Sequence, residues 1–481
     1  MGLMTAEEHK QSLRDDRVVY LRGERVEDVT TDPLLRICVG TAGIDYEMAH
    51  MPEYRDLAVV SHPETGEPIS RYYYTPQNVD DLIKRHELMV AGTRFGMGVV
   101  PFTHDIGADA MNAVSIAANT MGKKEYLERA ESYRDYLQKK DLSVAVAMTD
   151  VKGDRVLHPS SPKQAHPDYY VRVVDRDNKG IIVRGAKAHI TASAYFNELF
   201  VAPCRVMAEQ DADYAVAFAV PANAKGLKHI CHPLKAEWGP LDFPVDLPVR
   251  AHTDCLVIFD DVFVPWDRVF LCGEWSHVMT LVYNFATLHR HTAASYRIPM
   301  TEILVGMAQA MAEHNGIEWV GHVREKITDL VMYLDTLKSL ARASCLDYVM
   351  HGGIPIPNPV LCNIAKYNFA ANYHNCARAI QDIAGGLLMT APTYKDYQNP
   401  ETRGYVEKYL GGKAGIPTEH RLRMMQLIRR WVGMELEVSA LHAEGSLQAQ
   451  RMMIYGESMA QIQEYKKRAE VLAGIRREGE S

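Results

Sequence analysis

The chain has 481 residues, of which 47% are hydrophobic and 24% are charged, and its formal net charge is −8. This length exceeds what one ordinary hydrophobic core accommodates and predicts two or three domains, and the composition is that of a folded globular protein. The acidic balance argues against a protein that binds duplex nucleic acid, because such proteins present a basic face to the phosphates.

No apolar run approaches the length of about 18 residues that a membrane-spanning helix needs, so no membrane segment is expected. Residues 1–17 are charged and lack the apolar stretch of a signal peptide, which predicts a cytoplasmic location. No two of the 8 cysteines form a CxxC pair. The cysteines therefore favour buried thiols in a reducing compartment over a zinc ribbon or a ferredoxin-type cluster.

Residues 75–140 carry the apolar spacing of helices. A first helix is predicted to begin at Asn78, because apolar side chains recur at helical spacing after it. Small apolar residues over 109–120 and a charged amphipathic stretch over 124–139 predict two more helices. We therefore expect a mainly helical N-terminal domain over residues 1–140.

The pattern changes after Leu142 to short apolar runs separated by turns. Residues 177–180 read Asp-Asn-Lys-Gly between two strand-like runs, which predicts a hairpin. Prolines recur through this stretch and would interrupt long helices. These features predict an all-β domain over residues 141–275, with strands expected at 143–148, 169–174, 181–183, 214–220 and 256–264.

Helical spacing returns after the β domain. Apolar side chains between Ile327 and Leu340 recur at three- and four-residue spacing, which predicts a long helix. Stretches rich in glycine and proline over 352–357 and 391–416 are expected to be loops. The order of helices, strands and long helices predicts an α+β fold that ends in a helix bundle over residues 276–481.

No GxGxxG motif follows a strand-like run and no P-loop is present, so a nucleotide cofactor would need another scaffold. Hydroxyl and backbone N–H groups in the turn at residues 147–155 could grip the edge of a heterocycle or a phosphate. Thr191, at the end of a predicted strand, could donate a hydrogen bond to a ring nitrogen. The same segments could instead be a charged surface loop and a strand with one exposed face.

Two glycine-containing turns are further candidates for a cofactor site. Gly385 and Gly386 follow a predicted helix, where they could cap the helix or let the backbone approach a pyrophosphate closely. Gly445 and Ser446 open another predicted helix, whose free N–H groups would suit an anion.

Taken together, these segments and residues 259–268 resemble the 4-hydroxyphenylacetate 3-monooxygenase / 4-hydroxybutyryl-CoA dehydratase family over nearly the whole chain. The resemblance implies an acyl-CoA dehydrogenase-like fold with an N-terminal helical domain, a central β-barrel domain and a C-terminal helix bundle. It also implies FAD and a homotetramer in which residues 381–386 serve a neighbouring subunit. The FAD contacts that it implies are Met148, Thr149, Arg155, His189, Thr191, Gln381, Gly385, Gly386, Gly445 and Ser446.

The family contains two chemistries. One branch hydroxylates phenols with reduced FAD and oxygen, and the other dehydrates 4-hydroxybutyryl-CoA with FAD and a [4Fe–4S] cluster held by three cysteines and one histidine. The positions that match these ligands are Pro101, Asp105, Tyr296 and His289 in this chain. Because iron–sulfur clusters are held by thiolates, we expect no cluster and no other metal. The glutamate expected in the dehydratase branch falls on Ser439.

The resemblance therefore implies a two-component monooxygenase that hydroxylates a phenolic or heteroaromatic molecule through a C4a-hydroperoxyflavin, with reduced FAD supplied by a separate flavin reductase. His289 is the candidate base, and Tyr296, two helical turns further on, could share its face. Arg94 could bind an anionic group of the substrate. The alternatives are a cluster-free dehydratase, isomerase or dehydrogenase that acts on an acyl-CoA or a related acid, and a flavin-binding subunit without activity.

Overall fold

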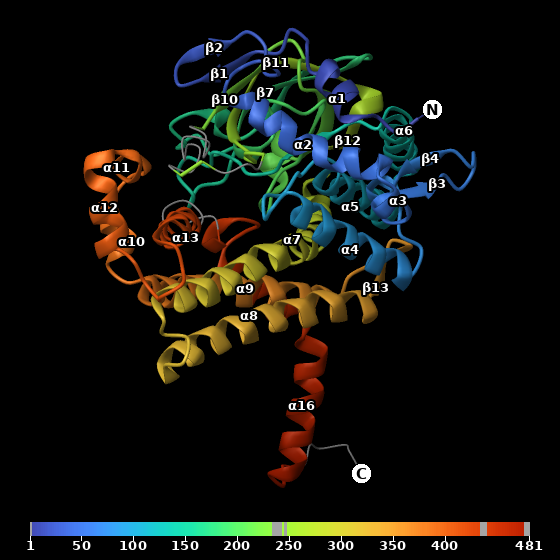
Figure 1. Cartoon of the computed structure of the whole chain (residues 1–481). Helices are drawn as coiled ribbons and strands as arrows, with labels where there is room; N and C mark the ends of the chain where they lie inside the picture. The colour runs from blue at the N-terminus through green and yellow to red at the C-terminus, as the bar shows by residue number, and fades with distance from the viewer. Residues whose placement is uncertain (1, 233–242, 245–247, 433–439, 476–481) are drawn as a thin grey trace.

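The computed structural model describes residues 2–232, 243–244, 248–432 and 440–475 and shows three parts (Figure 1). A group of helices from the start of the chain lies beside a β region, and long helices from the last third pack against both. The α+β fold expected from the sequence, with N-terminal helices, a central β region and C-terminal long helices, is confirmed. No helix in the described ranges is both long and apolar enough to cross a membrane.

The N-terminal part is mainly helical. Asn78 caps α4 by accepting a hydrogen bond from the amide of Asp81 at 3.1 Å, as its position before the apolar pattern indicated. Helix α5 is buried over most of its length, which places Asp105 and Asp109 inside the protein. The helices and the small hairpin of this part are α1 (Ala6–Ser12), α2 (Leu35–His50), α3 (Pro52–Ala58), β3 (Val59–Ser61), β4 (Pro68–Ser70), α4 (Val79–Phe95), α5 (Asp105–Met121) and α6 (Lys124–Lys140).

Two short strands near the N-terminus join the central sheet. Strands β1 (Val19–Leu21) and β2 (Glu24–Val26) extend a six-stranded sheet with the order β2-β1-β10-β11-β7-β6. Strand β1 runs parallel to β10, with Val19 opposite His229. A three-residue strand has too few side chains to reveal itself by alternation, so only its distant partner makes this pairing visible.

The β region consists of this sheet and a four-stranded sheet with the order β12-β9-β8-β5. The rings of Phe218 and Phe259 meet edge to face at 5.9 Å where the two sheets pack together. The hairpin predicted at residues 177–180 is confirmed by the antiparallel pairing of β6 and β7. The strands are β5 (Val144–Ala147), β6 (Arg172–Arg176), β7 (Gly180–Thr191), β8 (Glu198–Val201), β9 (Val216–Pro221), β10 (Leu227–Cys231), β11 (Asp254–Pro265) and β12 (Val269–Cys272).

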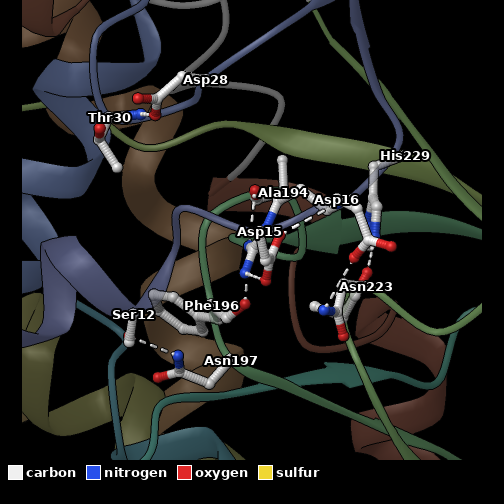
Figure 2. A network of polar contacts seen from close by, with 12 residues as sticks. Ser12, Asp15, Asp16, Asp28, Thr30, Ala194, Phe196, Asn197, Asn223 and His229 are labelled. Carbon is white, nitrogen blue, oxygen red and sulfur yellow. Dashed lines mark hydrogen bonds and ion pairs between the residues drawn. The ribbon is translucent and has the colours of Figure 1, made fainter.

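A polar network fastens the segment after α1 to the β region (Figure 2). The buried guanidinium of Arg17 donates to the carbonyls of Ala194 at 3.0 Å and Phe196 at 2.9 Å, and it pairs with Asp15 at 2.7 Å. The amide of Asn197 donates to the Ser12 hydroxyl at 2.8 Å. These contacts hold the helical part and the β region in one body.

The C-terminal part is built on three long helices that lie side by side, α7 (Val278–Asn315), α8 (Gly321–Leu346) and α9 (Pro359–Ala384) (Figure 1). The long helix predicted between Ile327 and Leu340 lies within α8. Helix α16 (Met459–Leu472) extends away from the body of the protein (Figure 1). The remaining helices include α10 (Leu387–Thr390), α13 (Thr418–Trp431) and α15 (Leu447–Glu457).

Two stretches that were expected to be loops carry regular structure. Residues 352–357 overlap a hairpin of β13 (Val349–His351) and β14 (Ile354–Ile356), which turns through two glycines with positive φ. Residues 391–416 contain α11 (Tyr394–Gln398) and α12 (Pro400–Tyr409), capped by Thr393 and Asn399. Both helices are short and mostly exposed, so apolar spacing could not reveal them.

Candidate active site

The candidate site lies along one stretch of α7 that is buried almost continuously. The structure places His289, Tyr296 and the neighbouring Arg297 on this stretch, between α5 on one side and residues 440–446 on the other. The side chain of His289 is 15% exposed, and Tyr296 and Arg297 are almost fully buried.

Asp109 of α5 holds His289 from one side. Its Oδ2 accepts a hydrogen bond from the Thr292 hydroxyl at 2.8 Å and lies 3.6 Å from Nδ1 of His289, while Arg85 lies 2.9 Å from Oδ1. Burial raises the pKa of Asp109, but Arg85 and His289 outweigh this effect and lower it. The His289 ring also stacks on Phe285. A histidine whose one nitrogen faces a fixed carboxylate is oriented for proton transfer at the other.

Asp105 is a second buried carboxyl in the same region. It is 3% exposed, and its Oδ1 accepts a hydrogen bond from the amide of Ile106 at 2.8 Å. Burial and the nearby Asp109 carboxylate raise the pKa of Asp105 to about 6. A carboxyl group that titrates this close to neutrality can take up or release a proton during a reaction.

Glu444 is the functional candidate that the sequence reasoning missed. Its carboxylate pairs with Nη1 of Arg297 at 2.6 Å, accepts a hydrogen bond from the Tyr296 hydroxyl and lies 3.7 Å from Nζ of Lys366. Burial raises the pKa of Glu444, but the charges of Arg297, Lys366 and His289 outweigh it and lower the pKa to about 2. The only sequence signal was its place directly before Gly445 and Ser446. Ser439, the position expected for a glutamate, lies outside the described residues.

Basic side chains gather around Glu444. Arg290 donates to the Glu444 carbonyl at 3.2 Å and to Asn363 Oδ1 at 2.6 Å, and Lys366 is completely buried. Burial and the neighbouring Arg297 lower the pKa of Lys366 to about 7. Within the described part of the chain, these three cationic groups face one carboxylate, so this side of the site suits an anionic group.

The turn that carries Met148 and Thr149 is fixed to β7. The Ala188 amide donates to the Thr149 carbonyl at 2.9 Å. The buried Lys187 ammonium donates to the Met148 carbonyl at 3.1 Å and pairs with Asp150 at 2.5 Å. The half-buried hydroxyl of Thr149 is therefore held on a rigid support, which fits the edge of a planar cofactor.

Thr191 ends β7, and its hydroxyl donates to Asp254 at 2.6 Å. His189, two residues earlier, is exposed and has a φ of 59°, and Arg155 is exposed beyond the Met148 turn. The structure thus places Met148, Thr149 and Thr191 on one end of the β region, while Arg155 lies in its surface loop.

The two glycine turns lie at different depths. Gly445 has a φ of 96°, and a side chain there would approach Arg290 within 3.1 Å, so this turn is packed against the basic groups. Ser446 caps α15 by accepting a hydrogen bond from the Ala449 amide at 3.3 Å. Gly385 and Gly386 are exposed at the end of α9.

Two predicted residues have other partners in this chain. The amide of Gln381 donates to the Val432 carbonyl at 2.7 Å. Arg94 lies on the surface, where its guanidinium forms a two-point ion pair with Glu302 at 3.0 and 2.7 Å. The structure places Arg94 with Glu302 and not in contact with His289 or Tyr296, and its role stays a prediction.

Comparisons with known proteins extend over the whole length of the chain. The family model described as 4-hydroxyphenylacetate 3-hydroxylase N terminal matches residues 5–271. The model described as 4-hydroxyphenylacetate 3-hydroxylase C terminal matches residues 278–474. The chain is 33% identical to a 4-hydroxybutyryl-CoA dehydratase/vinylacetyl-CoA-Δ-isomerase of Clostridium aminobutyricum, covering 98% of this chain and 100% of that protein. It is 30% identical to a 4-hydroxyphenylacetate 3-monooxygenase oxygenase component of Thermus thermophilus, covering 85% and 84%.

The solved structures that resemble this chain are of the same two kinds, a dehydratase and a monooxygenase component. An oxygen-tolerant archaeal 4-hydroxybutyryl-CoA dehydratase from N. maritimus superimposes with a TM-score of 0.91 at 30% identity, covering 100% of this chain and 97% of that one. The oxygenase component of a 4-hydroxyphenylacetate 3-monooxygenase, complexed with FAD, superimposes with a TM-score of 0.87 at 27% identity, covering 98% and 100%.

Proposed function

The chain belongs to the 4-hydroxyphenylacetate 3-hydroxylase family, and on that premise we propose that it is the oxygenase component of a two-component flavin monooxygenase. Its substrate would be a phenolic or heteroaromatic small molecule, and a separate flavin reductase would deliver reduced FAD. Reduced FAD, when bound, supplies the activation of molecular oxygen. The residues of the chain must bind the ring, remove its proton and exclude water.

The observation that carries the proposal is a set of buried protonatable side chains beside His289, at positions where the resemblance leads us to expect cluster cysteines. Asp105 and Tyr296 occupy two of the positions expected for cluster cysteines, and both are buried. Asp105 interacts electrostatically with His289 and with Tyr296. A region that would hold a cluster in the dehydratase branch is in this chain equipped for proton transfer.

In the proposed reaction, His289 accepts the proton of the substrate hydroxyl, which makes the aromatic ring more electron-rich. Asp109 orients the imidazole and stabilises its protonated form. Tyr296, held by Glu444, positions the ring of the substrate. The basic groups Arg290 and Lys366 favour a substrate with a carboxylate or another anionic group. Arg94 stays an alternative anchor, which would first have to leave Glu302.

The residues that would hold FAD lie at the end of the β region and at the glycine turns. Thr149 and Thr191 would bind the edge of the flavin ring, and Gly445 and Ser446 would approach its phosphates. Met148 would pack against the ring, with Arg155 and His189 at the rim. Gln381, Gly385 and Gly386 would reach the cofactor of a neighbouring subunit.

A homotetramer is part of the proposal. Several large apolar side chains of the C-terminal part stand exposed and would be available to contact another subunit. Trp319 is 70% exposed, Met332 on α8 is 56% exposed, and Leu472 at the end of α16 is 90% exposed. Association of subunits through these helices would bury them and bring the exposed end of α9 to a second chain.

The second candidate is a cluster-free dehydratase, isomerase or dehydrogenase of an acyl-CoA or a related acid. The similarity to the dehydratases and the buried carboxylate of Glu444 beside Tyr296 favour it. A pKa lowered to about 2 makes Glu444 a weak base at neutral pH, which is why the monooxygenase is the first choice.

The deciding experiment is to load the protein with FAD, photoreduce it without oxygen and mix it with aerated buffer. An oxygenase should show a transient near-UV absorption band before the spectrum of oxidised FAD returns, and a generic flavin reductase with NADH should support hydroxylation of a panel of phenols. Conversion of an acyl-CoA under anaerobic conditions, without any such band, would favour the second candidate. Stoichiometric iron and sulfide in anaerobically purified protein would contradict both.

A further inference from the structure

A second group of buried ionisable side chains lies behind Asp105, in the N-terminal helical part. His104, the residue before α5, has its Nε2 3.3 Å from Oδ1 of Asp141 and its Nδ1 3.9 Å from Oδ2 of Asp45. All three side chains are 2% exposed. We refer to Asp45, His104 and Asp141 as the buried triad.

The polar atoms of the buried triad are poorly satisfied. Both oxygens of Asp45, both ring nitrogens of His104 and Oδ1 of Asp141 are buried without a hydrogen bond of good geometry. Leaving such a group unpaired costs about 1–3 kcal/mol. Several unpaired groups side by side therefore indicate a shared proton, an internal water molecule or a functional role.

The surroundings of His104 are apolar and aromatic. The rings of Tyr46 and Tyr73 meet it edge to face at 4.9 and 5.3 Å, and Tyr72 stacks on it at 6.2 Å. The ionisable and charged groups that face the buried triad from the neighbouring elements are His9 on α1, Arg17 beyond it, Tyr46 on α2, Tyr72 and Tyr73 before α4, Arg85 on α4, and Asp105 and Asp109 on α5.

Burial and the mutual contacts shift the pKa values of Asp45 and His104 upward. Burial raises the pKa of Asp45 to about 7. Burial lowers the pKa of His104, but Asp141 and Asp45 outweigh that effect and raise it above its ordinary value. Asp45 can therefore exchange a proton with the adjacent His104 near pH 7.

The buried triad connects two regions. On one side, His104 is followed directly by Asp105, whose carboxyl faces the His289 end of the candidate active site. On the other side, Oδ2 of Asp141 accepts a hydrogen bond from the Met4 amide at 3.0 Å, in the N-terminal segment that covers this part of the protein. Asp45 and Asp105 interact electrostatically, which links the buried triad to the site side of the helix.

We infer that the buried triad is a proton-transfer route that serves the candidate active site through Asp105. Hydroxylation of a phenol by oxygen, with the anion of reduced FAD as the two-electron donor, takes up one proton and releases one water molecule. The site excludes bulk water, so this proton must arrive through the protein. The residues of the buried triad position and pass protons and do not touch the substrate. The role in proton delivery rests on the proposed function. The sharing of a proton within the buried triad is independent of the proposed function.

The first test concerns the shared proton and needs no substrate. Infrared spectra of the FAD-loaded protein, recorded across neutral pH, should show the C=O band of a protonated carboxyl group that titrates near pH 7, in keeping with the pKa of about 7. Asp45→Asn should remove the part of this band that titrates near pH 7 and leave any part that belongs to Asp105, whose pKa is about 6. Absence of the band in the wild type, or an identical band and titration in Asp45→Asn, would overturn the inference.

The second test concerns proton delivery. The photoreduced, FAD-loaded protein is mixed with oxygen without substrate, and hydrogen peroxide release is followed against pH. His104→Gln and Asp45→Asn should slow release by about tenfold or more and shift or abolish its dependence on pH near neutrality. His229→Gln is the control, because His229 is equally buried in the β region but is hydrogen-bonded to Ser193 and Ala222.

The outcomes separate the two claims. If the wild type shows no transient band with oxygen, the monooxygenase is wrong, and the infrared titration still decides whether the shared proton exists. If the oxygen reaction occurs and both triad variants keep the pH profile of the wild type, the route is wrong and the monooxygenase stands. Asp45→Asn is nearly isosteric, and its bound FAD and circular dichroism report whether it folds.

Discussion

Arg297 and Glu444 form a buried ion pair at the centre of the candidate site, with Nη1 and Oε2 separated by 2.6 Å and both side chains no more than 5% exposed. The pair joins α7 to the turn before α15, so it links two segments that are far apart in the sequence. Lys366, on α9, lies 3.7 Å from the same carboxylate. The single negative charge of Glu444 therefore compensates cationic groups from two long helices.

Glu444→Gln should lower the free energy of unfolding at neutral pH by about 3–5 kcal/mol, because it leaves Arg297 buried without a counter-charge. The pKa of Glu444 is about 2, below its ordinary value of 4.5. Its stabilising effect is therefore complete above about pH 4.5 and is lost as the pH falls towards 2. Urea denaturation should show the difference from the wild type shrinking on acidification. The control Glu302→Gln, at the exposed pair with Arg94, should cost no more than about 1 kcal/mol.

Lys366 should give a pH dependence of the same sign in a higher pH range, because here the buried charge is destabilising. Its pKa is lowered from 10.5 to about 7, so between these values the unfolded chain binds more protons than the folded protein. The free energy of unfolding should rise as the pH increases through this range. Lys366→Met should remove this pH dependence. The free energy of unfolding of the variant should exceed that of the wild type by the largest amount below about pH 7. A wild type and variant with parallel stability curves from pH 6 to 10 would contradict a lowered pKa.

The sequence predicted the elements whose signal is local. Helices α4, α5, α6 and α8 carry apolar side chains at helical spacing, and the turn at 177–180 carries its own hairpin signal. Strand β1 could not be found in this way, because its partner β10 lies far along the chain. Glu444 was missed for a similar reason, since its importance comes from Arg297 and Lys366, which no short window contains. The contact of His289 with Asp109 could not be predicted from the sequence either, because Asp109 lies on another helix.

Lys187→Met should weaken FAD binding. Lys187 is buried between Asp150, the Met148 carbonyl and the Ala202 carbonyl, so its loss frees the turn that carries Thr149 and leaves Asp150 unpaired. Fluorescence titration with FAD should show a larger dissociation constant for Lys187→Met than for the wild type. The double variant Lys187→Met/Asp150→Asn should recover stability without recovering the full affinity for FAD. Lys228→Met, at the exposed pair with Asp260, is the control and should bind FAD like the wild type.

Gly385 and its neighbour Gly386 should differ on substitution. Gly385 has a φ of 74° and a ψ of −173°, a conformation that costs a side-chain-bearing residue about 1–3 kcal/mol, whereas Gly386 has a φ of −61°. A side chain at Gly385 meets no atom of its own chain within 4 Å. Gly385→Val should therefore reduce FAD affinity through the backbone, and Gly386→Val should reduce it less. Equal FAD affinity in Gly385→Val and the wild type would remove this turn from the cofactor site.

His289 should matter for chemistry more than for folding. Its side chain keeps 15% exposure, its Nδ1 faces Asp109 at 3.6 Å, and its ring rests on Phe285 at 5.3 Å, so few contacts are lost when it is shortened. If it is the base, His289→Ala should reduce turnover by about 100- to 10,000-fold. FAD should still bind, and the oxygen reaction should end in hydrogen peroxide without hydroxylated product.

The matched control for His289 is His291 on the same helix. His291 is fully buried, its Nε2 lies 3.2 Å from the Cys345 thiol, and burial lowers its pKa to about 3, so it stays neutral and serves packing. His291→Ala should lower the melting temperature and leave turnover per folded molecule nearly unchanged. Measured side by side, the two variants should show opposite patterns of stability and turnover. A lower melting temperature with normal turnover in His289→Ala would remove His289 from the catalytic residues and leave Asp105 as the candidate base.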